Sequence, residues 1–157
     1  MSDKEWRFLD KWAELIMVLA TIVPPFMTVL YSINGGGMSG MNIAILALFW
    51  GIFPPVGSVG GFQILNGYYL PASLSLGFFN IIFAFQVILF IRGKSSKRKT
   101  LAVGAMTIIV PLIAFVSAMQ YMVSFESFAY IGPIPIQPVI GLLLMRFLGP
   151  EEPTTPW

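Results

Sequence analysis

Residues 21–28 read TIVPPFMT and place two consecutive prolines, Pro24 and Pro25, inside a run apolar enough to cross a membrane. A second pair, Pro54 and Pro55, follows in the stretch GIFPPVGS. Proline lacks the backbone N–H that a helix interior needs, and its ring clashes with the preceding turn. The two pairs therefore predict breaks at these four residues in helices that would otherwise be continuous.

Composition predicts the solvent in which these helices fold. The chain has 57% hydrophobic and 10% charged residues, whereas a soluble domain has about 25% charged residues. No charged residue occurs between Glu14 and Arg92, and a bilayer penalises charge at its centre by about 2.5 kcal/mol or more. The predicted fold class is an all-α integral membrane protein, a small polytopic bundle in a plasma or cytoplasmic membrane.

The lengths of the charge-free runs predict four or five membrane segments, because about 20 helical residues cross the hydrocarbon. The expected segments are residues 12–31, 43–65, 72–91, 101–123 and, shorter than the others, 134–149. Residues 1–149 would then form one transmembrane helical domain that begins with an amphipathic interfacial stretch, residues 1–14. Residues 150–157, rich in proline, are expected to be an irregular tail.

The basic residues predict the topology and leave one question open. RGKSSKRK carries five basic residues, so residues 92–100 are expected on the cytoplasmic side. The N-terminus is also basic, yet three expected segments separate it from this loop. Either the N-terminus lies outside, or residues 43–65 re-enter on one side, since only eleven apolar residues precede Pro54. Re-entry would place all nine basic residues on the same side.

Small residues recur at helical spacing in two segments and predict close helix packing. In lipid, small residues let helix backbones approach one another, and this packing is a main source of association. The segment at 72–91 carries a stripe of Ser73, Gly77, Asn80 and Ala84, and the segment at 101–123 carries Gly104, Thr107, Pro111, Ala114 and Ala118. We expect these stripes to face each other in a hairpin. Gln86 and Gln120 lie away from the stripes and are expected to meet another partner.

Catalytic and cofactor chemistry has few candidate residues. The chain has no cysteine and no histidine, which removes disulfides, thiolate chemistry and the usual ligands of zinc and haem. Nothing in the sequence brings Glu14 and Glu126 together, and no nucleophile is accompanied by an obvious base. The sequence therefore predicts no enzyme, no cofactor, no metal site and no nucleic-acid partner.

Two functions fit these features. The first is a non-catalytic structural or accessory subunit of a membrane complex or homo-oligomer, with the lipid bilayer, other membrane subunits or copies of itself as partners. The alternative is a channel or transporter module that moves a neutral or apolar solute past the proline-broken helices, since interrupted helices expose backbone groups inside membranes.

Overall fold

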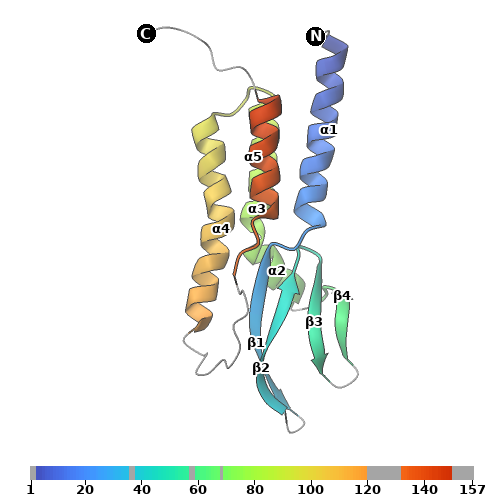
Figure 1. Ribbon diagram of the computed structural model, residues 1–157, viewed down its shortest axis with the longest axis vertical. Coiled ribbons are helices and arrows are strands. Elements are labelled where there is room, and N and C mark those ends of the chain that lie inside the picture. The colour runs from blue at the N-terminus through green and yellow to red at the C-terminus, as the bar shows by residue number, and fades with distance from the viewer. Residues whose placement is uncertain (1–2, 36–37, 57–58, 68, 120–131, 150–157) are drawn as a thin grey trace.

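The computed structural model describes residues 3–35, 38–56, 59–67, 69–119 and 132–149 of the chain. These residues form helices together with a four-stranded antiparallel sheet (Figure 1). The helices are α1 (Asp3–Ile22), α2 (Tyr69–Leu76), α3 (Phe78–Ile91), α4 (Lys97–Met119) and α5 (Ile136–Leu148). The strands are β1 (Met27–Gly35), β2 (Met38–Leu46), β3 (Trp50–Val56) and β4 (Val59–Ile64), paired in the order β1-β2-β3-β4. The long helices lie alongside one another, and the sheet extends from one end of them.

The prediction of an all-α, multi-pass membrane bundle is wrong. The expected segment at 12–31 divides into the end of α1 and the start of β1, and the one at 43–65 is strand rather than a re-entrant helix. Within the described residues, only Lys97–Ser117 is a single helix long and apolar enough to cross a membrane. The pair α2 and α3 would count as a second such helix if they are taken together, but they are bent by 47°.

The first proline pair ends α1 and starts the sheet. α1 stops at Ile22, and the prolines that follow cannot continue its hydrogen-bond ladder. Beyond them, β1 pairs with β2 in a regular register from Met27↔Leu46 to Gly35↔Met38. Residues 28, 29 and 33 of β1 are Thr, Val and Ile, which are β-branched and favour strands. The apolar run therefore changes from helix to strand.

The second proline pair lies in β3 and not in a helix. Pro54 and Pro55 lie where the β3–β4 register shifts, between Phe53 and Val56. Proline cannot donate to a ladder and is tolerated in strands at such irregular positions. The predicted break of a second helix at Pro54 and Pro55 is therefore wrong, because no helix runs through these residues.

The segment that leads into α5 lies along the outer edge of β1. The Thr28 N–H donates to Gly132 O at 3.0 Å, and the Ile134 N–H donates to Phe26 O at 2.7 Å. The Thr28 side chain adds to this contact, because its Oγ1 accepts from the Gly132 N–H at 2.5 Å. These bonds attach the start of the last helix to the first strand.

Two apolar clusters hold the parts together. One lies among the helices and consists of Met17, Phe83, Ala84, Val87, Phe90 and Met145. The other joins the sheet to α2 and consists of Phe26, Met27, Leu46, Leu48 and Leu65. Phe83, only 1% exposed, is at the centre of the first cluster.

The basic residues gather at the end of the helices opposite the sheet. This end is formed by the first half of α1, the end of α3, the start of α4 and the end of α5 (Figure 1). The basic residues carried there are Lys4, Arg7, Lys11, Arg92, Lys94, Lys97, Arg98, Lys99 and Arg146. Residues 3–14 belong to α1, which continues without a break to Ile22.

Candidate functional site

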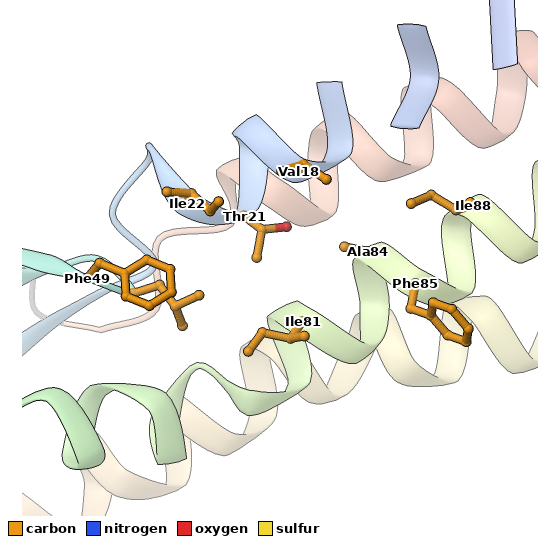
Figure 2. A pocket seen from close by; sticks show the side chains of 9 residues that line it. Val18, Thr21, Ile22, Phe49, Ile81, Ala84, Phe85 and Ile88 are labelled. Carbon is orange, nitrogen blue, oxygen red and sulfur yellow. The ribbon is translucent and has the colours of Figure 1, made fainter. Parts of the chain in front are cut away.

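A groove of about 340 Å³ lies between α1 and α3, next to the turn that joins β2 and β3. Figure 2 shows side chains from the two helices and from the turn pointing into it. The groove is lined by Val18, Thr21 and Ile22 of α1, by Leu48 and Phe49 of the turn, and by Ile81, Ala84, Phe85 and Ile88 of α3.

The surface of this groove is hydrocarbon. Thr21 is the one polar residue among those that line it, and its hydroxyl is engaged elsewhere. It donates to Met17 O at 2.7 Å and accepts from Gln137 Nε2 at 2.7 Å. With no titratable side chain in its lining, the groove suits binding of an apolar group rather than acid–base chemistry.

Gln137 of α5 links α5 to α1 and α3, next to Thr21 of the groove. Its Nε2 donates to Thr21 Oγ1 of α1 and, at 2.7 Å, to Asn80 O of α3, while Gln137 itself belongs to α5. The side chain is 4% exposed, so both bonds are shielded from water. Its Oε1 has no partner within the described residues. Such a buried amide fixes the relative positions of the helices it joins.

An ion pair joins α1 to the end of α3, at the basic end of the helices. Arg92, just after α3, pairs with Glu14 of α1, and both side chains are partly exposed. A narrow crevice lined by Ala13, Glu14, Ile88, Ile91 and Arg92 shares Ile88 with the groove. The apolar groove therefore leads toward a cationic side chain.

The small residues predicted on the 72–91 segment have several different neighbours. Ser73 Oγ is 2.8 Å from Ala47 O and 3.1 Å from Leu48 O, in the turn between β2 and β3. A Cβ added at Gly77 would lie 2.7 Å from Leu48 Cδ1. Asn80 is buried beside Gln137, and Ala84 lines the groove. These residues face the sheet, α1 and α5.

The small residues of α4 meet a bulky partner. Gly104, Thr107 and Pro111 are buried, and Ala114 is half-buried. A Cβ added at Gly104 would lie 2.8 Å from Phe83 Cε2 of α3. The hairpin of α3 and α4 therefore places an aromatic ring against a glycine, rather than one small stripe against another.

Other predicted residues are distributed as follows. Gln86 is half-buried and accepts a hydrogen bond from Ser95 Oγ at 2.7 Å. Pro24 and Pro25 connect α1 to β1, while Pro54 and Pro55 belong to β3, so the second pair does not interrupt a helix. The Ala118 side chain, Gln120, Glu126 and residues 150–157 lie outside the described part of the structure.

Sequence reasoning missed Phe83 and Gln137. Nothing in the sequence distinguishes Phe83 from the other phenylalanines of the 72–91 segment, and only its contacts identify it as the centre of packing. Gln137 offered a usable signal, because an amide inside the apolar stretch IPIQPVIG requires a hydrogen-bond partner if it is buried.

Neither metal-ligating side chains nor similarity to a known protein identifies a further site within the described residues. Across the described segments, no group of three or more His, Cys, Asp or Glu side chains could hold a metal ion. Comparisons with protein-family models, with curated proteins and with solved structures find no match for this chain.

Proposed function

We propose that this chain is a non-catalytic integral membrane protein that serves as a structural or accessory subunit. In this proposal, lipid and neighbouring subunits cover the apolar outer surface of the helices, and α4 is the inserted helix. The alternative of a solute path loses its main support, since Pro54 and Pro55 do not break a helix.

The observation that carries the proposal is the exposure of α4. The most apolar 18-residue window within its stretch Lys97–Ser117 has a mean hydropathy of 2.2, but only 17% of that window is buried by the described residues. An apolar helix in a soluble protein is buried in the core, where its side chains are removed from water. Here Ile113 and Val116 are 59% and 57% exposed. Their exposure supports a cover of lipid or of another subunit.

Exposed apolar side chains on other helices support the same conclusion. α1 presents Leu15, Ile16 and Leu19, and α5 presents Leu143 and, at 74% exposure, Phe147. Large exposed apolar side chains on several helices support contact with a membrane or with another protein. Subunit helices and lipid chains would both remove it from water.

The charge distribution also fits a membrane interface. Lys94, Arg98 and Lys99 are exposed at the end of the helices that lies opposite the sheet. A basic residue near an anionic leaflet gains about 1 kcal/mol from the surface potential. One end of the apolar helices is thus suited to anionic headgroups.

The test follows the full-length tagged chain through membrane fractionation and then native mass spectrometry. We expect it to stay with membranes after an alkaline carbonate wash and to be extracted by detergent with other subunits or copies of itself. Release as a soluble monomer would overturn the membrane assignment. A stable lone monomer in detergent would overturn the subunit role.

A charge variant with a matched control sharpens the test. Ile109→Lys places a cation on the exposed apolar face of α4 near the middle of Lys97–Ser117, and a Lys at the centre of an inserted helix costs about 2.5–3.5 kcal/mol. We expect it to reduce membrane retention. Ser96→Lys adds the same charge at the exposed basic end and should leave retention unchanged.

A further inference from the structure

We propose that the groove between α1 and α3 binds one acyl chain of an anionic phospholipid whose phosphate lies at Arg92 and Lys94. This inference rests on the proposed membrane location, and it adds a lipid-specific site to it. The occupant follows from the shape of the groove, from its lining and from the charge at its end.

The lining fits a hydrocarbon chain. The groove has about 340 Å³, at the lower end of the range of about 300–1,000 Å³ for ligand sites. Ile81 and Ile88 both line it and are seven residues apart on α3, which is about 10 Å along a helix axis. Apolar cavities of this kind do not hold water well, because water finds no hydrogen-bond partners there. A long apolar ligand would fill it.

The volume of the groove and the linkage of its walls favour an acyl chain over a protein helix. A helix with its side chains is about 10–12 Å across, whereas the groove has about 340 Å³ and its two walls, α1 and α3, are linked through Gln137. An acyl chain can lie in it without separating α1 from α3.

The charge at the end of the groove identifies the headgroup. Ile88 belongs both to the groove and to the crevice that contains Arg92, one helical turn further along the chain. The Arg92 side chain is 47% exposed, and Lys94 is exposed next to it. A guanidinium binds phosphate oxygens through two parallel hydrogen bonds. A lipid lying in the groove would bring its phosphate to this position.

Substitution of Glu14 can distinguish lipid binding by Arg92 from a purely structural role of Arg92. Its carboxylate pairs with the Arg92 guanidinium and would compete with a phosphate for it. Removing the carboxylate leaves the cation available to lipid, whereas removing the cation abolishes the binding group. If Arg92 only held α1 to α3, the two changes would act alike.

The experiment uses the full chain in nanodiscs that contain phosphatidylglycerol and phosphatidylcholine with identical acyl chains. Incorporation is recorded first, and the lipids that remain after release into mild detergent are then counted by native mass spectrometry. We expect the wild-type chain to retain phosphatidylglycerol in preference to phosphatidylcholine. Arg92→Gln should reduce this preference about fivefold, the factor for one basic residue at an anionic surface. Glu14→Gln should keep or increase it.

Two neighbouring positions on α1 test the acyl-chain site. Val18 and Leu19 are 45% and 49% exposed, but only Val18 lines the groove. Val18→Phe should fill part of the groove and lower retention of both lipids. Leu19→Phe adds a similar side chain outside the groove and should retain lipid like the wild type.

The outcomes separate the site from the proposed function. A chain that fails to incorporate overturns the membrane assignment and the lipid site with it. A chain that incorporates but retains both lipids equally overturns the anionic site alone. Equal loss of preference in Arg92→Gln and Glu14→Gln would also overturn it, as would equal retention in Val18→Phe and Leu19→Phe.

Discussion

The ring of Phe83 lies directly on the backbone of α5 at Gly141, where an added Cβ would be 2.5 Å from Phe83 Cε1. Gly104 of α4 approaches the same ring from another helix. Phe83 therefore packs against glycines of two helices, and its burial depends on the absence of side chains at both.

Gly141→Ala should lower the free energy of unfolding by about 1–3 kcal/mol, because a methyl group would force the buried ring out of its position. Alanine favours a helix over glycine by about 1 kcal/mol, so any loss of stability would come from packing. Denaturant titration of the full chain in detergent measures the change. Adding Phe83→Leu should recover part of the loss, and a single variant as stable as the wild type would contradict the prediction.

Thr21 and Gln137 should be energetically coupled. Thr21→Val removes the hydroxyl that accepts from Gln137 Nε2, and Gln137→Leu removes the donor that also serves Asn80 O. Each single change should cost about 1–3 kcal/mol, because it leaves a buried polar group without its partner. The double variant should cost less than the sum of the two. Strict additivity in a double-mutant cycle would refute the coupling.

Ser73 should contribute more to stability than Ser75 of the same helix. The Ser73 hydroxyl is fully buried and donates to the β2–β3 turn, whereas the exposed Ser75 hydroxyl donates to Pro71 O within α2. Ser73→Ala should destabilise the chain by about 1–2 kcal/mol by leaving a buried carbonyl without a donor. Ser75→Ala is the matched control and should have little effect. Equal stability of both variants would show that the buried bond contributes nothing.

Replacing the first proline pair should extend α1 into the sheet. With Pro24→Ala and Pro25→Leu, the chain regains the N–H groups and the helix propensity to continue past Ile22. Phe26 would then lose its bonds to Leu46 O and to the Ile134 N–H, which are 3.0 and 2.7 Å long. Hydrogen exchange at these amides should accelerate. Pro71→Ala in α2 is the control, and unchanged protection in the double variant would contradict the prediction.

The helices after Tyr69 were largely predictable from local sequence. The expected segments at 72–91, 101–123 and 134–149 correspond to α2 with α3, to α4 and to α5. Their apolar runs are bounded by the basic loop and by proline, and these are local signals for helix ends. The clustering of charge at one end of the helices also follows from where the charges fall in the chain. The Gly77 bend between α2 and α3 was not foreseen.

The sheet was the main failure, and the reason is physical. Residues 27–64 are apolar or neutral on both faces of the strands, so they lack the alternation that identifies a half-buried strand. Two local signals were present: the β-branched residues of β1, and the glycine-rich stretch NGGGMSGMN, which contains the end of β1 and the start of β2 and is typical of hairpins. The helix prediction for this region followed the length of the charge-free run instead of these two signals, although length alone does not distinguish a helix from strands.

By itself, the sequence determined that the chain is apolar, that its charges lie in a few short stretches, and that its first apolar run is interrupted at Pro24 and Pro25. Only the tertiary structure decided that β1–β4 follow that interruption, that Phe83 packs between Gly104 and Gly141, and that Gln137 bonds to α1 and α3. Charge and proline effects are local and can be assigned residue by residue. Strand pairing and side-chain packing join residues far apart in the chain, so they depend on which surfaces meet after folding.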